Sequence, residues 1–187
     1  MSISRFAIVA TMAIALSACG TSGSASAQLT VNGHSASIAL YTSLVAAERQ
    51  KLERTGASIG PTSATGKQRE ASIEASVIRE LVRDAVVEQL AAARGITIAT
   101  ADLKTRLSAA EQAFGGPLAF EQALEQAGLS RTDFGAVLRY RLLEAQLMQA
   151  GADSRAIDAA VAKARVVITI GPCSKAGSYP ACVSTSA

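Results

Sequence analysis

Apolar residues recur at steps of three and four along most of the chain, which is the spacing of one face of an amphipathic helix. In the longest such stretch, Ile73, Val77 and Leu81 follow one another at four-residue intervals, and Gly95 supplies a stop. The pattern predicts helices at residues 37–54, 68–94, 100–114, 118–128, 130–150 and 154–163. A loop rich in glycine and serine, residues 56–67, separates the first two of them.

Capping residues support two of these helix starts. Ser130 and Asp133 form a capping-box-like pair, in which the serine side chain accepts from a backbone N–H of the first turn. Asp153 or Ser154 begins the last helix, after Gly151 breaks the preceding pattern. These capping residues therefore predict the first residues of the helices at 130–150 and 154–163.

Two short segments have the character of β-strands instead. Leu29–Asn32 alternates and runs into Asn32-Gly33, a pair typical of tight hairpin turns. Arg165–Ile170 is rich in β-branched residues. Because each strand needs a partner, we expect the two to pair. The predicted fold is mainly α: a helical bundle with a short two-stranded sheet joining the N- and C-terminal ends of the domain.

The N-terminus has the anatomy of an export signal. Arg5 precedes an apolar run, Phe6 to Leu16, that is too short to span a bilayer. Leu16-Ser17-Ala18-Cys19 then resembles a lipobox, in which Cys19 is the lipid anchor, receives a diacylglyceryl group and further acyl chains such as palmitate, and becomes the new N-terminus. The alternative is an ordinary secreted protein cut after Ala25-Ser26-Ala27, which also has small residues at the required positions.

These features divide the chain into four parts. We expect a lipoprotein signal peptide at residues 1–18 and a flexible tether of small polar residues at 19–28. The helical domain occupies residues 29–170, and a C-terminal tail with a disulfide loop occupies 171–187. The protein is therefore expected outside the cytoplasm, attached to a bacterial membrane on its extracytoplasmic side.

Composition and charge exclude some classes of protein. Hydrophobic residues make up 49% of the chain but aromatic residues only 4%, with no Trp, a balance that favours helices packed through small side chains over an all-β fold. The formal net charge of +3 is small and dispersed. Nucleic acid is therefore excluded as a partner.

Cys173 and Cys182 enclose a short loop containing glycine and proline. In an exported chain such a pair favours a disulfide. A zinc site is not expected, because the sole imidazole, His34, is far away in the sequence. The sequence indicates neither a metal site nor a cofactor.

The sequence offers no set of residues suited to catalysis. His34 follows a turn without an acidic partner marked nearby, which indicates an exposed turn histidine. Acidic residues between Glu48 and Glu88 alternate with arginine and lysine at helical spacing, as on a solvated face. Gly115-Gly116-Pro117 has neither the strand before it nor the Lys-Ser/Thr after it that a phosphate loop needs. We expect no enzymatic activity.

Several motifs follow one another in a fixed order over residues 29–170. Val31-Asn32-Gly33 precedes a helix, and Gly95-Ile96-Thr97-Ile98 follows the longest one. Phe120-Glu121-Gln122-Ala123-Leu124 then precedes Gly128-Leu129-Ser130. The same block includes Phe114-Gly115, Asp133, Leu138 and Arg141-Leu142-Leu143. This order resembles the N-terminal chaperone domain of SurA, which is shared in outline with PrsA-type foldases and the peptide-binding part of trigger factor.

The resemblance implies a helical domain that binds unfolded or extended polypeptides, including exported proteins, in an apolar groove. Family members usually continue into a parvulin-type prolyl isomerase domain after the strand that corresponds to Val166–Ile170. Fewer than twenty residues follow Ile170 here, and His34 alone cannot supply that domain's histidine-lined pocket. We therefore expect no isomerase activity.

Tyr140, Leu143 and Met148 are the candidate peptide-binding residues, because they lie partly off the main apolar stripe of their helix and are expected to be exposed. Three aromatic residues on the main stripes are assigned to the core instead: Phe114, Phe120 and Phe134.

The expected function is non-enzymatic, chaperone-like binding of unfolded segments by a membrane-anchored lipoprotein. One alternative is a structural or interaction lipoprotein that uses the same fold for one fixed envelope partner. Another is an accessory to a separate prolyl isomerase or secretion machine. The sequence leaves these alternatives open, and it does not set the oligomeric state.

Overall fold

The computed structural model describes residues 27–174 and 178–184. The expected signal peptide, the anchor Cys19 and most of the tether lie outside these residues. Within the described part of the chain, no helix has the length and apolarity required to cross a membrane. The fold given below is therefore that of the domain which follows the expected tether.

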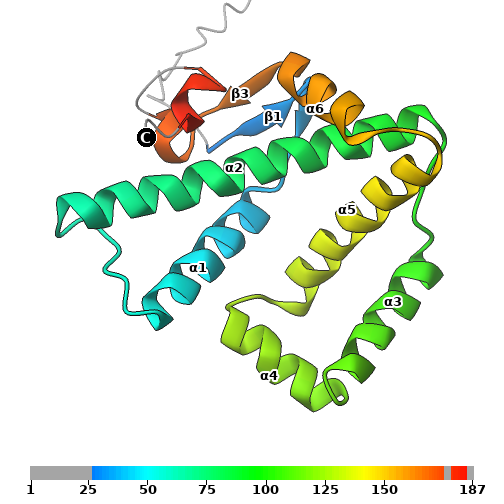
Figure 1. The fold of residues 1–187 in the computed structure, drawn as a ribbon, viewed down its shortest axis with the longest axis horizontal. Helices are drawn as coiled ribbons and strands as arrows, with labels where there is room; N and C mark the ends of the chain where they lie inside the picture. Colours follow the sequence, from blue (N-terminus) through cyan, green and yellow to red (C-terminus); the bar gives the residue numbers. More distant parts are fainter. Residues whose placement is uncertain (1–26, 175–177, 185–187) are drawn as a thin grey trace, which may run out of the picture.

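The domain is mainly helical, with one small sheet (Figure 1). Its helices are α1 (Ile38–Arg54), α2 (Ala64–Ala93), α3 (Thr100–Ala113), α4 (Pro117–Ala127), α5 (Arg131–Gln149) and α6 (Ser154–Lys163). Its strands are β1 (Leu29–Val31), β2 (His34–Ser35) and β3 (Val166–Ile168), and two short 3₁₀ helices follow, η1 (Gly171–Ser174) and η2 (Ala181–Val183). The predicted class and the six predicted helices are confirmed.

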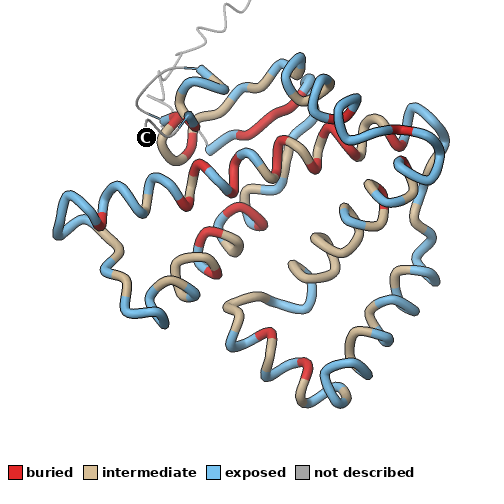
Figure 2. The backbone as a smooth tube through the Cα atoms, viewed as in Figure 1, coloured by how far each residue is buried: buried red, intermediate tan, exposed pale blue. Residues whose placement is uncertain are grey.

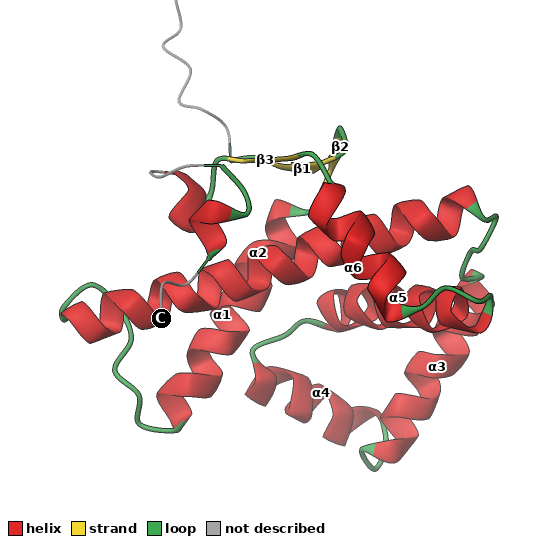
Figure 3. Cartoon of the chain, turned by 45° about the horizontal axis from the view of Figure 1, so that its top comes forward, coloured by secondary structure: helices red, strands yellow, loops and turns green. Residues whose placement is uncertain are grey.

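Helix α2 is the spine of the domain. The sheet and α6 lie on one side of it, and α1 and α5 lie on the other (Figures 1 and 3). It begins four residues earlier than the apolar pattern predicts, because Ser63 caps it by accepting a hydrogen bond of 2.9 Å from the Gly66 N–H. The first turn of α2 therefore occupies part of the predicted loop 56–67.

The sheet joins the two ends of the domain, as predicted, but it contains three strands rather than two. β1 pairs antiparallel with β3, with Leu29 opposite Ile168 and Val31 opposite Val166. On its other edge β1 pairs with β2 across the Asn32-Gly33 turn. Both turn residues have positive φ, 54° and 85°, as a tight hairpin of this kind requires. The third strand is only two residues long, too short to give an alternating pattern.

The core follows α2 and β1 (Figure 2). One buried cluster joins β1, α1 and the middle of α2, and includes Val31, Ile78 and Val82, each 0% exposed. A second cluster lies between the end of α2, α5 and α6, where Leu147 and Ile157 are also 0% exposed. Burying side chains of this size contributes about 1.5–3 kcal/mol each. Helix α2 supplies residues to both clusters and so holds the two halves together.

The described residues after Ile170, 171–174 and 178–184, pack against the core. η1 and η2 both contact α2, and Val183 is 2% exposed. The predicted disulfide between Cys173 and Cys182 is present. The Arg79 guanidinium on α2 also donates to the Val183 carbonyl. This loop is therefore part of the folded unit.

Helices α3, α4 and α5 form an arm that extends from α2 (Figure 1). Phe120 is 1% exposed and lies edge-on between Phe114 and Phe134, with ring centroids 5.7 and 5.2 Å away. The expectation that Phe114 is buried is wrong, since 53% of it is exposed. It is the C-cap residue of α3, and its ring meets Phe120 edge-on. Arg131 lies over the Phe120 ring and forms ion pairs with Glu111 and Glu121.

The tip of the arm returns to α1. Gly128 ends α4 in the left-handed conformation, with φ 70°. A Cβ at this position would lie 3.3 Å from the Ala47 Cα and closer still to the Gln50 side chain, so only glycine permits this approach of α4 to α1. The Arg54 guanidinium donates to the Gln126 carbonyl across the same contact. The arm is thereby fixed at both ends.

Candidate functional site

A pocket of about 340 Å³ lies where the β-hairpin, α2 and α5 meet. Leu81 and Ala85 of α2 contribute apolar surface, and Tyr140 of α5 contributes its ring. The remaining lining residues are His34, Ser35, Ala36, Ser37, Glu88, Gln89 and Ala92. We call this site the Tyr140 pocket. Its apolar surface inside a polar rim suits it to hold an apolar side chain.

The Tyr140 ring is held by charged neighbours. The Arg139 guanidinium lies 5.8 Å from the ring centroid and forms an ion pair of 2.7 Å with Glu88, which lines the pocket. The pKa of Tyr140 is raised by burial and by the negative charges of Glu88 and Asp84, whereas Arg139 lowers it. The phenol therefore remains neutral at physiological pH.

Gln89 fixes the hairpin wall of the pocket. Its Nε2 donates to the Val31 carbonyl at 3.0 Å, and its Oε1 accepts from the Asn32 amide at 2.8 Å. Both contacts join α2 to the hairpin turn. The pocket is thus bounded by a rigid helix and by a hairpin hydrogen-bonded to it.

Ion pairs join α2 to α5 near the pocket. The Glu80 carboxylate pairs with Arg141 at 2.9 Å, and the Arg83 guanidinium binds Glu144 of α5 and Asp158 of α6, each at 2.6 Å. Arg141 and Asp158 are exposed, so their pairs contribute little to stability, whereas Arg83 and Glu144 are both partly buried. Together the pairs connect α5 and α6 to the same part of α2.

Asp84 lies between these pairs without a hydrogen-bond partner of its own among the described residues. It is 6% exposed. Burial, together with the negative charges of Glu80 and Glu144, raises its pKa to about 7, although Arg141 and Arg83 oppose this change. At acidic pH the side chain is therefore neutral, and near pH 7 it exchanges its proton.

A second pocket, of about 170 Å³, lies between α1, α2 and the end of α4. Leu44 of α1, Val77 of α2 and Leu129 after α4 supply apolar surface to it. Because Val77 precedes Leu81 by one turn of α2, the two pockets follow one another along the same helix. We call this site the Leu44 pocket.

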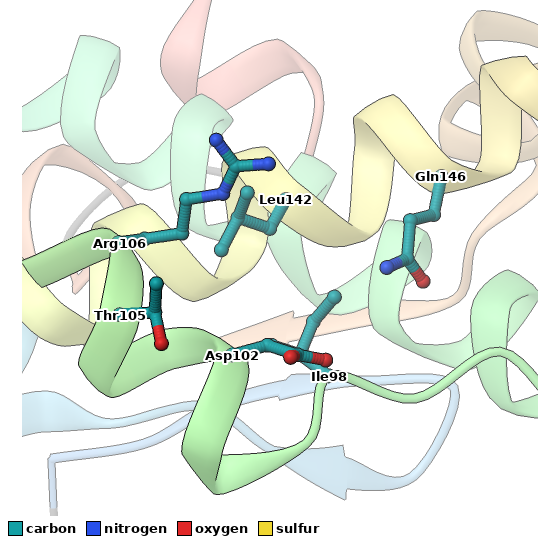
Figure 4. A pocket seen from close by; sticks show the side chains of 6 residues that line it. All are labelled: Ile98, Asp102, Thr105, Arg106, Leu142 and Gln146. Carbon is teal, nitrogen blue, oxygen red and sulfur yellow. The ribbon is translucent and has the colours of Figure 1, made fainter. Parts of the chain in front are cut away.

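A third pocket, of about 260 Å³, separates α3 from α5 and is more polar. Figure 4 shows side chains of α3 and α5 facing one another, with Ile98 contributed by the link before α3. Only Ile98 and Leu142 are apolar, whereas the others are Asp102, Thr105, Arg106 and Gln146. It is therefore less suited to apolar side chains than the Tyr140 pocket.

The three sequence-predicted binding residues are not brought together. Tyr140 lines the pocket named after it. Met148 is 51% exposed, but it lines none of the pockets described here. The expected exposure of Leu143 is wrong: it is 2% exposed, in the cluster formed with α2 and α6. Helix α2 packs on this part of α5, and Ile157 of α6 joins the same cluster, which the periodicity of α5 alone does not reveal.

Sequence reasoning missed the other walls of the Tyr140 pocket. Leu81 and Ala85 belong to the apolar stripe of α2, and the periodicity of that stripe does not show which of its residues line a pocket. In the structure Leu81 is buried and Ala85 is half-buried. The hairpin carried a usable signal, the Asn32-Gly33 turn, which places His34 and Ser35 directly after it.

The described residues contain no group of three or more His, Cys, Asp and Glu side chains placed to hold a metal ion. His34 is exposed at the rim of the Tyr140 pocket, and Glu88 there is paired with Arg139. The residues that line the Tyr140 pocket therefore offer apolar contacts and hydrogen-bonding groups to a ligand.

The family model of the SurA-like N-terminal domain matches residues 2–148. The chain belongs to this family. No curated protein and no solved structure matches it. No catalytic domain is detected in these comparisons.

Within the described residues, the SurA-like N-terminal domain match covers the elements from β1 to almost the end of α5, and so includes both apolar pockets along α2. Helix α6, β3 and the disulfide-closed loop follow the matched residues. Membership is consistent with chaperone-like peptide binding. Together with the disulfide, it indicates an extracytoplasmic location.

Proposed function

We propose that this SurA-like N-terminal domain binds unfolded or extended segments of other polypeptides by apolar contact, without catalysing a reaction. The observation that carries the proposal is the Tyr140 pocket, where the half-buried Ala85 lies beside the Tyr140 ring and the buried Leu81 lines the wall. Its volume of about 340 Å³ is at the small end of ligand pockets. It therefore suits single side chains of a client rather than a folded surface.

The spacing of the two pockets along α2 supports an extended client. Val77 and Glu80 of α2 line the Leu44 pocket, and α2 residues from Leu81 to Ala92 line the Tyr140 pocket. The midpoints of these two stretches are about eight residues apart, or ~12 Å along the helix axis. Side chains on one face of an extended chain repeat every ~6.6 Å, so every second one repeats at ~13 Å. An extended client lying along α2 can therefore place side chains four residues apart in the Leu44 and Tyr140 pockets.

The charges around these pockets favour tolerance of many client sequences. Glu80 and Glu88 on α2 are each paired with an arginine on α5. The rims of the two pockets thus carry paired opposite charges rather than an excess of positive or negative charge. Shape and apolarity, rather than a fixed hydrogen-bond pattern, then decide which segments bind.

We also propose that the chain is a lipoprotein anchored through Cys19, with residues 1–18 removed and 19–28 as the tether. The sequence Leu16-Ser17-Ala18-Cys19 supports this reading. Anchoring would present the domain to chains emerging on the extracytoplasmic side. Replacing Cys19 by Ser would release the protein from membranes, as measured by fractionation of cells, if this proposal is right.

Aggregation of a chemically unfolded model client, followed by light scattering, tests the binding function. The chain is purified after export and added at several molar ratios. The variant Ala85→Glu introduces a charge into the pocket on a helix that tolerates glutamate. Met148→Ser, an apolar-to-polar change outside the pockets, is the matched control.

We expect dose-dependent suppression by the unchanged protein and by Met148→Ser, and its loss in Ala85→Glu. Absence of suppression at every ratio would overturn the general chaperone proposal and direct the search to one fixed envelope partner. If Ala85→Glu suppresses aggregation as well as the unchanged protein does, and circular dichroism shows that its fold is intact, the client does not bind in the Tyr140 pocket.

A further inference from the structure

Strand β3 forms one edge of the sheet, and its hydrogen bonds to β1 establish which way its backbone groups point. The strand order is β2-β1-β3. At one end the Asn32 N–H donates to the Arg165 carbonyl at 2.7 Å, and at the other the Thr169 N–H donates to the Gln28 carbonyl at 2.9 Å. Residues 165 and 169 therefore face β1.

Bonded positions alternate along an antiparallel strand. Val167, midway between 165 and 169 and opposite Thr30, therefore also faces β1. The N–H and C=O groups of Val166 and Ile168 point to the outer edge. In the part of the chain that is described, no further strand pairs with this edge, and neither N–H forms a backbone hydrogen bond outside the sheet.

The side chains at this edge are also incompletely covered. Val31 and Leu29 on the central strand are 0% and 1% exposed. Their cross-strand partners Val166 and Ile168 share the same core cluster but are only half-buried. On the opposite face, Val167 is 47% exposed. An added strand would cover the remaining apolar surface of all three β3 side chains.

Proteins commonly protect such edges with proline, lysine or a bulge. β3 has none of these: it consists of Val166, Val167 and Ile168, all of them β-branched. Arg165, which directly precedes the strand, is turned toward β1 by its backbone, since its backbone N–H donates to the Asn32 Oδ1 at 2.9 Å. The edge is thus open to pairing and well suited to the extended conformation.

We propose that the outer edge of β3 binds an extended segment of another polypeptide as a fourth strand of the sheet. Main-chain hydrogen bonds to Val166 and Ile168 would supply the affinity, and they are largely independent of the partner's sequence. The site lies on the opposite edge of the sheet from β2, which lines the Tyr140 pocket. It also lies beyond the residues matched by the family model.

The length of the strand favours such a segment over a second copy of this chain. Three residues span about 10 Å. Stable protein pairs bury about 800 Å² on each partner, far more than one pair of such strands supplies. A short peptide strand that binds weakly and reversibly needs no comparable area.

The experiment uses the chain purified after export and a short fluorescent peptide of alternating valine and threonine, flanked by lysines. Ile168→Pro removes one outward N–H while leaving the bonds of 165, 167 and 169 to β1. Ile168→Ala is the matched control, since it shortens the same side chain but keeps the N–H. A second probe is the same peptide N-methylated along its central residues.

We expect the peptide to bind Ile168→Pro about five- to tenfold more weakly than Ile168→Ala, the loss expected for an interstrand hydrogen bond. The N-methylated peptide should lose binding to the unchanged protein. In amide exchange measured by NMR, the Val166 and Ile168 N–H groups should exchange rapidly in the free protein and slowly with peptide. The Val167 N–H, bonded to β1, should be slow in both.

Equal binding of the plain and the N-methylated peptide would overturn the proposal, as would unchanged amide exchange at Val166 and Ile168 when peptide is added. If Ile168→Pro fails to fold, the comparison of the two peptides on the unchanged protein still tests the proposal. If the Val166 and Ile168 amides become protected in the absence of peptide as the protein concentration rises, a second copy of this chain binds the edge. That result would also overturn the proposal. Ala85→Glu separates the sites: it should leave this peptide binding intact even if client suppression is lost.

Discussion

The Asn32 side-chain amide donates to the Gln89 Oε1 at 2.8 Å, joining the hairpin turn to α2 across 57 residues of sequence. Gln89 also donates to the Val31 carbonyl at 3.0 Å. The first structural turn of the domain is therefore tied to the middle of its sequence. This contact places β2 at the rim of the Tyr140 pocket.

Replacing Gln89 by Ala should lower the free energy of unfolding by about 1–3 kcal/mol, since two hydrogen bonds are lost and a partly buried carbonyl is left without its donor. Urea denaturation followed by circular dichroism measures the change. Gln112→Ala, on the exposed surface of α3, is the control and should change stability little. Similar values for the two variants would contradict the role given to Gln89.

Asp84 should make the domain more stable in mild acid than at neutral pH. Its carboxyl has a folded pKa of about 7 against an ordinary value of 3.8, so the folded state holds a proton that the unfolded state releases between these values. The free energy of unfolding should therefore fall as pH rises from about 4 to about 7, and then level off.

The variant Asp84→Asn isolates this effect, because it keeps the shape of the side chain and removes the titration. We expect it to be more stable than the unchanged protein at pH 8, with the difference shrinking toward pH 5. Denaturation curves at both pH values provide the comparison. A constant difference between the two proteins across this range would show that Asp84 does not titrate as described.

Loss of the Cys173–Cys182 disulfide should destabilise the domain by about 2–3 kcal/mol, the value expected for a short closed loop. The loop holds η1 and η2 against α2, so its release also exposes part of the main core. The unchanged protein should lose stability when a reductant is added. The double variant Cys173→Ser and Cys182→Ser should have this lower free energy of unfolding with or without reductant.

Replacing Phe120 by Ala should lower the free energy of unfolding by about 3–5 kcal/mol, because this buried ring joins Phe114 to Phe134. It should also loosen α3 and α4 within the arm formed by α3, α4 and α5. Hydrogen exchange of the α3 and α4 amides measures the local effect. Leu118→Ala is the control on the same arm, where the side chain is 75% exposed. Equal exchange in both variants would mean that the aromatic contacts do not fix the arm.

Features fixed by neighbouring residues could be predicted from the sequence. Ser130 caps α5 by accepting from the Asp133 N–H at 3.0 Å, and Asp153 caps α6 by accepting from the Ala156 N–H at 2.6 Å. The Asn32-Gly33 turn and the Cys173–Cys182 disulfide are equally local. Each depends on groups within about ten residues of one another, so the sequence contains all the information needed.

The tertiary structure alone decided which apolar faces remain accessible. Leu143 and Tyr140 lie less than one turn apart on α5, yet Leu143 is buried in the cluster with α2 and α6, while Tyr140 lines a pocket beside the hairpin. Likewise, Asp84 is buried because α5 packs over its side of α2. A helix's own periodicity marks its apolar side, but burial depends on which distant segment packs there. The sequence therefore determined the helices and their ends, and the packing of α5 and α6 on α2 determined the site.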